Sequence, residues 1–213
     1  MIVLAGGRAT RLGGADKPGL VVGGQTLLAA VVTAGTEAGA RRVVVVGPDR
    51  PGIADARRGG AIRFVREEPP GSGPVPALRR GLAELDDATE QAATEPGAAA
   101  EPWVAVLAAD LPFLRAAHLR ALLAAAANRD GAVLADDGGR PQWLAGCWPT
   151  AVLRRAVAGY QGSSLHGLLA PLRPVSVSLP PRPGEPPPWL DCDTEQDLRR
   201  AQDLAAGKAG PAR

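Results

Sequence analysis

The sequence predicts an α/β fold of three layers, α/β/α, in which a mostly parallel sheet is covered by helices on both faces. Short apolar runs rich in β-branched residues alternate along the chain with Ala- and Leu-rich segments of helical period. The chain has 213 residues and is 46% hydrophobic, which is enough to bury a full-sized core. No apolar run approaches the roughly 18 residues that a membrane-spanning helix needs.

Six segments have the short, apolar and β-branched composition of buried strands. They are residues 1–5, 42–47, 62–65, 103–108, 132–135 and 174–179. Four other segments have helical periodicity, and two of them follow a threonine suited to cap the helix, Thr26 or Thr194. The predicted helices are residues 27–38, 75–85, 115–127 and 195–206.

The predicted organisation is a single domain over residues 1–206 that contains one insert. The insert, residues 86–101, is rich in Ala, Glu, Thr and Pro without periodicity, so we expect a disordered or loosely helical loop. Six prolines between positions 180 and 188 predict an extended surface connection. Residues 207–213 are expected to form a frayed tail.

Charge and cysteine content exclude several classes of protein. The net charge is +2, and the 24 basic and 22 acidic residues are mixed along the chain, so no basic footprint for nucleic acid stands out. The first predicted strand begins at Met1 without a charged leader, which argues against a secretory signal. Cys147 and Cys192 have neither the density of a disulfide scaffold nor the spacing of a zinc site. We therefore expect a cytoplasmic protein with a small-molecule partner and no membrane association.

The first predicted strand runs directly into a glycine-rich segment that contains Arg8, Arg11 and Lys17. Glycines let backbone N–H groups approach an anion, and the three cations favour a polyphosphate ligand. The spacing fits neither the Walker A loop nor the dinucleotide fingerprint. The alternative is a tight strand-to-helix connection with solvated arginines. Lys17 favours a ligand site, because it is the only lysine outside the last six residues of a chain with 22 arginines.

Two acidic residues are candidate ligands of a divalent metal. Asp110 follows the strand that reads as most buried, and open parallel sheets bind ligands outside the carboxyl ends of their strands. Mg²⁺ takes one or two protein carboxylates and completes its shell with water and phosphate oxygens. Asp193 could supply the second carboxylate. The alternatives are that Asp110 caps the turn after its strand, and that the segment around Asp193 only starts a helix, with Thr194 as its cap and Glu and Asp in its first turn.

Two further segments are candidate walls of a binding site. The Gly- and Pro-rich loop at residues 67–74 ends at a helix start that could receive an anion or the edge of a base, although a plain connecting loop explains it equally well. Trp143 and Trp148 could line the far side of the crevice, although filling the core is the commoner role of such residues.

Five blocks of sequence, in this order, resemble the MobA-type nucleotidyltransferases. They span about residues 1–206 and read LAGGRATRLGGADKP (4–18), EEPPGSGPVPAL (67–78), AADLPFL (108–114), GRPQWLAGCW (139–148) and DCDTEQDL (191–198). The first and third blocks are the most specific. The resemblance implies a Rossmann-like, mostly parallel sheet of the nucleotidyltransferase (GT-A-like) type.

The resemblance also implies roles for individual residues. Lys17 would contact the phosphates, and Asp110 would hold Mg²⁺. Beyond the resemblance, we expect Arg11 to stabilise charge on the phosphates together with Lys17. Gly47 and Glu67 stand where the family carries an Asn and an Asp that contact the nucleotide. The residues expected to contact the nucleotide are Leu4, Ala5, Gly6, Gly7, Lys17, Gly47, Glu67, Gly73 and Asp110.

The activity that the resemblance implies is Mg²⁺-dependent transfer of GMP from GTP to the phosphate of molybdopterin, with release of pyrophosphate. One alternative is a related nucleotidyltransferase that uses CTP or another nucleotide with a cofactor or sugar-phosphate acceptor. The other is a nucleotide-binding protein without catalytic activity. Proteins that deliver the molybdenum cofactor or receive it would be further partners.

Overall fold

A computed structural model describes residues 1–6, 16–50, 61–92 and 103–207 of the chain. Within these ranges, seven strands form one sheet in the order β5-β4-β1-β6-β8-β7-β9. A separate small sheet is the hairpin of β2 (Val21–Val22) and β3 (Gln25–Thr26). The strands of the main sheet are β1 (Ile2–Leu4), β4 (Arg42–Val46), β5 (Ala61–Val65), β6 (Trp103–Ala108), β7 (Ala132–Ala135), β8 (Pro141–Pro149) and β9 (Val175–Ser178).

The strands β5, β4, β1 and β6 run parallel to one another, and β9 runs parallel to β7. By contrast, β8 pairs antiparallel with both β6 and β7. The four parallel neighbours therefore end at the same edge of the sheet. This is the edge at which an open parallel sheet binds its ligands.

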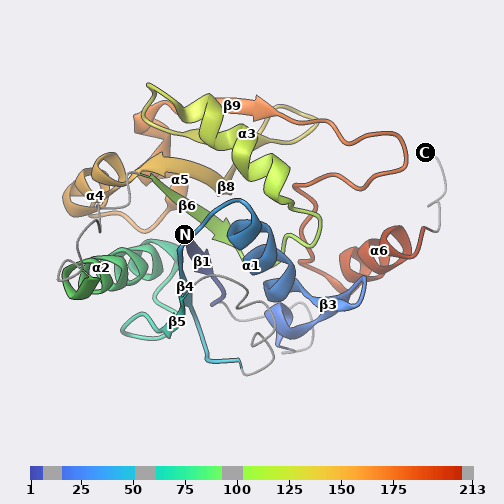
Figure 1. The fold of residues 1–213 in the computed structure, drawn as a ribbon, viewed down its shortest axis with the longest axis horizontal. Helices are drawn as coiled ribbons and strands as arrows, with labels where there is room; N and C mark the ends of the chain where they lie inside the picture. The colour runs from blue at the N-terminus through green and yellow to red at the C-terminus, as the bar shows by residue number, and fades with distance from the viewer. Residues whose placement is uncertain (7–15, 51–60, 93–102, 208–213) are drawn as a thin grey trace.

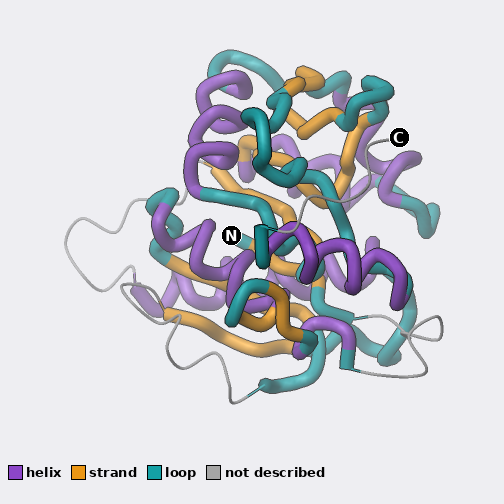
Figure 2. Tube along the Cα trace, turned by 90° about the vertical axis from the view of Figure 1, so that its right-hand side faces the viewer, coloured by secondary structure: helices purple, strands orange, loops and turns teal. Residues whose placement is uncertain are grey.

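Helices cover both faces of the sheet, as Figure 1 and Figure 2 show from two sides. Buried residues of α1 and α3 pack on one face, and those of α2, α4 and α5 pack on the other. The predicted three-layer α/β/α fold is therefore confirmed. The helices of the described residues are α1 (Leu27–Glu37), α2 (Pro74–Ala92), α3 (Ala116–Ala126), α4 (Thr150–Gly159), α5 (Leu165–Leu169) and α6 (Glu195–Ala205), with 3-10 turns η2 (Lys17–Gly19) and η4 (Ala170–Leu172).

The central strands are buried on both faces, and their side chains alternate between the two helical layers. In β4, Val43 and Val45 pack with α1 and α3, whereas Val44 and Val46 pack with α2. None of these four valines is more than 2% exposed. Burial on both faces explains why such strands are continuous apolar runs in the sequence.

Several predicted elements match the structure closely. The predicted strands at 103–108 and 132–135 coincide with β6 and β7. Thr26 caps α1 by accepting a hydrogen bond from the Ala29 N–H at 3.1 Å. Thr194 caps α6 by accepting one from the Asp197 N–H, also at 3.1 Å.

Other elements were predicted incompletely. The helix predicted to end at residue 85 continues to Ala92, so the first part of the expected insert is helical, and its remainder lies outside the described residues. The sequence analysis missed α4, α5 and the β2–β3 hairpin. It also missed β8, because this strand lacks β-branched residues, carries a proline at each end and shifts register against β7. The single-domain organisation and the frayed tail stay predictions.

A third apolar cluster joins the C-terminal part of the chain to the edge of the sheet. It contains Phe113 from the segment after β6, Leu190 and Cys192 from the segment before α6, and Ala201 from α6. Each is 9% exposed or less. The chain that enters α6 is therefore held beside the chain that leaves β6.

None of the helices in the described part of the chain combines the length and apolar character needed to cross a membrane. The expected cytoplasmic location stays a prediction.

Gly131, the residue directly before β7, offers a test of how tightly the core is packed around Trp148. Its φ is +143°, and a Cβ at this position would overlap the ring of Trp148, which is 0% exposed. Gly139, in the turn before β8, also has a positive φ of +73°, but no heavy atom lies within 4 Å of its Cβ position. We expect Gly131→Ala to lower the free energy of unfolding by about 1–3 kcal/mol more than Gly139→Ala, because only the first overpacks the core. Urea denaturation measures both values, and equal losses would contradict the predicted clash.

Candidate active site

The end of β1 lies between the ends of β4 and β6. The Ala5 N–H donates to the Val46 carbonyl at 2.8 Å, and the Ala109 N–H donates to the Leu4 carbonyl at 3.1 Å. Leu4 and Ala5 are 9% and 3% exposed, whereas Gly6 is exposed. This part of the chain therefore presents backbone, not side chains, at the carboxyl edge of the sheet.

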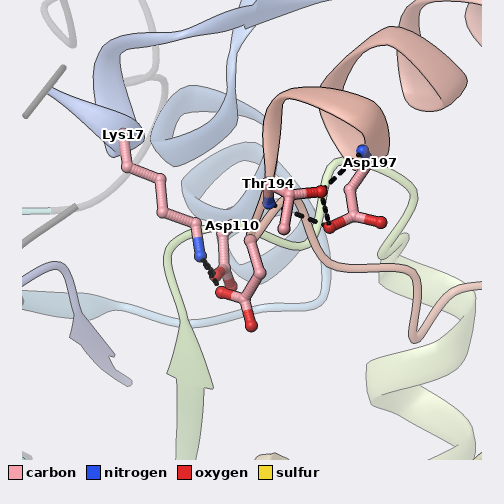
Figure 3. Close-up of polar contacts among 5 residues, drawn as sticks. Lys17, Asp110, Thr194 and Asp197 are labelled. Atoms are coloured by element: carbon pink, nitrogen blue, oxygen red, sulfur yellow. Dashed lines mark hydrogen bonds and ion pairs between the residues drawn. The ribbon is translucent and has the colours of Figure 1, made fainter. Parts of the chain in front are cut away.

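Lys17 lies at the centre of the site. The turn η2 is closed by the Leu20 N–H, which donates to the Lys17 carbonyl at 3.1 Å. The Lys17 ammonium forms an ion pair with Asp110 and donates to Asp193 Oδ1 at 2.5 Å. Figure 3 shows the Lys17 side chain directed at Asp110, close to the start of α6. The fold thus brings together three of the predicted site residues from three distant parts of the sequence.

The start of α6 leaves the Asp193 side chain free to face Lys17. Thr194 donates from its N–H and its hydroxyl to Asp197 Oδ2, at 2.9 Å and 2.6 Å, and completes a capping box with the Asp197 N–H (Figure 3). The cap is therefore supplied by Thr194 and Asp197. The cap by Thr194 that the sequence offered as the alternative is therefore present, Asp193 contacts Lys17, and its role as a metal ligand stays a prediction.

Burial and neighbouring charges raise the pKa values of three residues in and beside the site. Desolvation lowers the pKa of Lys17, but the attraction of Asp110 and Asp193 together outweighs it, so the pKa lies above its ordinary value. Burial, and then the nearby Asp193 and Asp110 charges, raise the pKa of Asp191. Burial also raises the pKa of the Cys192 thiol to about 12, so Cys192 is neutral at physiological pH and is not a nucleophile. Lys17 therefore remains a full positive charge among carboxylates.

Asp110 has the features of a metal ligand. One carboxylate oxygen faces Lys17, and the other, Oδ1, is buried without a hydrogen-bond partner among the described residues. A buried polar atom without a partner is costly unless a ligand binds it. No group of three or more acidic, His or Cys side chains within the described ranges forms a closed metal cage. Asp110 and Asp193 nevertheless fit Mg²⁺, which needs only one or two carboxylates when phosphates and water complete its shell.

Glu67 and two glycines form a second part of the site. Glu67 is 7% exposed, and its Oε1 accepts a hydrogen bond from the Gly71 N–H at 2.9 Å. A Cβ on Gly6 would lie 3.5 Å from the same oxygen, and a Cβ on Gly47 would lie 2.8 Å from the Ala5 carbonyl. The absence of a side chain at Gly47 therefore allows the ends of β1 and β4 to meet closely, whereas a Cβ on Gly6 would make only an ordinary contact with Glu67.

Gly73 lies apart from Lys17 in the described part of the chain. It precedes α2, where its carbonyl accepts from the Ala77 N–H at 3.2 Å. Gly7 and Arg11 lie outside the described residues, as does Arg8.

The two tryptophans differ in their surroundings. Trp148 is 0% exposed and belongs to the core, so its interpretation as a crevice wall was wrong. Trp143 is partly buried against the same core, and its ring meets His166 edge-on with 5.5 Å between centroids. Core filling, which the sequence analysis considered the commoner role, holds for Trp148.

The sequence analysis missed Arg50. Its Nε donates to both carboxylate oxygens of Asp16 at 3.0 Å, and its Nη2 donates to Asp16 Oδ1 at 2.6 Å. This pair joins the segment after β4 to the residue that precedes Lys17. Arg50 is one of 22 arginines, and nothing in its local sequence distinguishes it from a solvated surface cation.

The sequence is similar to a known family and to two kinds of guanylyltransferase. Residues 1–176 match the family described as the MobA-like NTP transferase domain. The molybdenum cofactor guanylyltransferase of a Bradyrhizobium species is 31% identical over 96% of this chain and 92% of the relative. The phosphoenolpyruvate guanylyltransferase of Frankia casuarinae is 33% identical over 77% of this chain and 51% of the relative.

Solved structures share the fold. A nucleotidyl transferase from a Methanothermobacter species has a TM-score of 0.67 at 24% identity, over 98% of this chain and 97% of its own. A Mycobacterium tuberculosis protein in complex with manganese has a TM-score of 0.61 at 20% identity, over 95% of this chain and 96% of its own. By its sequence over residues 1–176 and by its fold, the chain belongs to the MobA-like NTP transferase family and is a nucleotidyltransferase.

Proposed function

We propose that the protein transfers GMP from GTP to the terminal phosphate of molybdopterin and releases pyrophosphate. The observation that carries the proposal is the meeting of Lys17, Asp110 and Asp193 at the edge of the sheet where β1 presents its backbone. The names of the relatives support the choice of nucleotide, since both are guanylyltransferases. The relative that aligns over nearly its whole length acts on the molybdenum cofactor.

The proposed reaction is a displacement at the α-phosphorus of GTP. A phosphate oxygen of molybdopterin forms the new P–O bond, the bond to the bridging oxygen of pyrophosphate breaks, and pyrophosphate leaves with the bonding electron pair. The attacking phosphate is already an anion near neutral pH, so the protein does not need to supply a general base. Catalysis then depends on positioning and on neutralising the charge of the phosphates.

We assign these tasks to four side chains, of which Lys17, Asp110 and Asp193 lie in the described part of the chain. Lys17 would transfer its contacts from Asp110 and Asp193 to phosphate oxygens, and a compact ammonium suits that exchange. Arg11 is proposed as a second cation for the same phosphates. Asp110 and Asp193 are proposed to hold Mg²⁺, which would offset the charge of the triphosphate and of the leaving pyrophosphate.

We propose that the base lies on the Glu67 side of the site. Guanine presents two adjacent N–H donors on its Watson–Crick edge, and a buried carboxylate accepts such donors. Glu67 is 7% exposed and lies against Gly6, next to the β1 backbone. Leu4, Ala5 and Gly47 would contribute backbone groups, and Gly73 would contribute the start of α2.

A nucleotide panel tests the choice of GTP. We expect the Tm to rise with GTP more than with CTP, ATP or UTP, and Mg²⁺ to increase the shift. A ligand at about 100 times its Kd stabilises the folded state by about 2.7 kcal/mol, which differential scanning fluorimetry detects readily. A shift selective for another nucleotide would contradict the proposed base, and the absence of any shift would favour a protein that does not bind nucleotide first.

The acceptor is tested by pyrophosphate release. With GTP and Mg²⁺, we expect stoichiometric release in the presence of molybdopterin and none with phosphoenolpyruvate, because the relative named for the molybdenum cofactor covers more of the chain. A coupled phosphate assay and mass spectrometry of the product give both readouts. Release with phosphoenolpyruvate alone would overturn the proposed acceptor and leave the nucleotidyl transfer intact.

Asp110→Asn tests the proposed metal ligand. The amide keeps the size of the side chain but removes its charge, so we expect the rate of pyrophosphate release to fall by about 100-fold or more, with the fold retained. Asp137→Asn, in the exposed turn between β7 and β8, is the matched control and should leave the rate unchanged. Near-normal activity of Asp110→Asn would remove this residue from the metal site.

Lys17→Arg tests whether the site requires an ammonium. The charge is conserved, but a planar guanidinium cannot occupy the place between two carboxylates in the same way, so we expect the turnover to fall about tenfold or more. The reverse exchange, Arg199→Lys at an exposed position of α6, serves as control. Full activity of Lys17→Arg would show that only the charge matters.

A further inference from the structure

We infer that Arg50 is a positioning residue for Lys17 and that it acts through the carboxylate of Asp16. The inference rests on the phosphate role proposed for Lys17 above. It adds a residue from the segment after β4 whose hydrogen bonds, within the described part of the chain, go to Asp16 and Pro48 and not to Asp110 or Asp193.

The Arg50 guanidinium is held on two sides. Its Nε and Nη2 bind the Asp16 carboxylate at 2.6–3.0 Å, and its Nη1 donates to the Pro48 carbonyl at 3.1 Å. The Arg50 side chain is only 12% exposed, whereas that of Asp16 is 59% exposed. A planar guanidinium that is itself held by a second hydrogen bond restrains the position of the carboxylate more tightly than a single contact with a flexible side chain would.

Asp16 makes this contact instead of capping its own turn. It stands at the N-cap of η2, yet its side chain forms no hydrogen bond with the turn. Its backbone carbonyl accepts from the Gly19 N–H at 2.9 Å, and a Cβ on Gly19 would lie only 2.7 Å from Asp16 Oδ2. The turn and the glycine therefore leave the carboxylate directed toward Arg50, and the backbone of Lys17 is tied to the end of β4.

Such an anchor matters because the Lys17 side chain is long and flexible. In the structure its ammonium is restrained by Asp110 and Asp193. When the ammonium instead binds phosphate oxygens, these two contacts are lost. The position of the Lys17 Cα atom then depends on the backbone of residues 16–19. Arg50 also holds the pKa of Asp16 below its ordinary value, first through the hydrogen bonds it donates, so the pair is intact at neutral pH and Asp16 does not compete for Lys17.

The test measures the affinity for inorganic pyrophosphate in the presence of Mg²⁺ by isothermal titration calorimetry. Pyrophosphate is the leaving group of every nucleotidyl transfer from a triphosphate, so the result does not depend on the base or the acceptor. We expect Arg50→Gln to weaken binding about tenfold in the otherwise unchanged chain, because two charge-assisted contacts are lost. In the Lys17→Ala background the same substitution should have no further effect.

Three further variants separate positioning from general structural support. Asp16→Asn should reproduce Arg50→Gln, and the double variant should be no weaker than either single one. Arg50→Lys keeps the charge without the fork, so its affinity should lie between those of the unchanged chain and Arg50→Gln. Arg199→Gln removes an exposed ion pair of α6 and should bind pyrophosphate normally.

Three other results would each contradict a specific part of the inference. Equal weakening by Arg50→Gln with and without Lys17 would show that Arg50 acts on the ligand directly or on the fold as a whole. Normal binding by both Arg50→Gln and Asp16→Asn, with weak binding by Lys17→Ala, would overturn the inference and leave the proposed function standing. Normal binding by Lys17→Ala would remove the phosphate role of Lys17, and the inference with it. Urea denaturation of every variant identifies a loss that arises from unfolding.

Discussion

The contact of one ammonium group with two carboxylates is the constraint on which the site depends. Lys17 follows the first strand, Asp110 follows β6, and Asp193 precedes α6, so the contact joins three segments that are far apart in the sequence. Two carboxylates at a partly buried edge repel each other unless a cation lies between them. Other contacts serve this arrangement: the third apolar cluster holds the segment before α6 beside the one after β6, and the capping box directs Asp193 away from its helix.

The parts of the site that the sequence predicted depend on local signals. Asp110 could be found because it directly follows a buried strand, and Lys17 because lysine is rare in this chain. Asp193 was ambiguous, since its segment fits a helix capped by Thr194 and a metal site equally well, and the structure contains both the Thr194 cap and a contact of Asp193 with Lys17. Arg50 could not be found, because its partner is 34 residues away and only the parallel pairing of β1 with β4 brings the two segments together.

The difference between local signals and distant contacts also explains which strands were predicted and which were missed. The strands β1 and β4, which are buried on both faces, are continuous apolar runs rich in β-branched residues, and both were predicted. The composition of β8 is instead dominated by small and aromatic residues, and its pairing with β6 and β7 is set by antiparallel neighbours that the local sequence does not specify. Trp148 could be read as a pocket wall only while β8 was unrecognised, because the strand carries its ring into the core.

The two halves of the site are built in different ways, and this bears on how specificity can change within the family. The proposed phosphate half, Lys17 with its two carboxylates, depends on distant segments, so a change there affects several contacts at once. The proposed base half is local: the Glu67 carboxylate is held by the Gly71 N–H within one loop. At position 47 the Ala5 carbonyl already fills the space a Cβ would need, so an Asn could be introduced only with a shift of β1 or β4. Under the proposed function, contacts of this strand with the nucleotide would therefore come from backbone groups, and Glu67 would be the side chain that distinguishes one base from another.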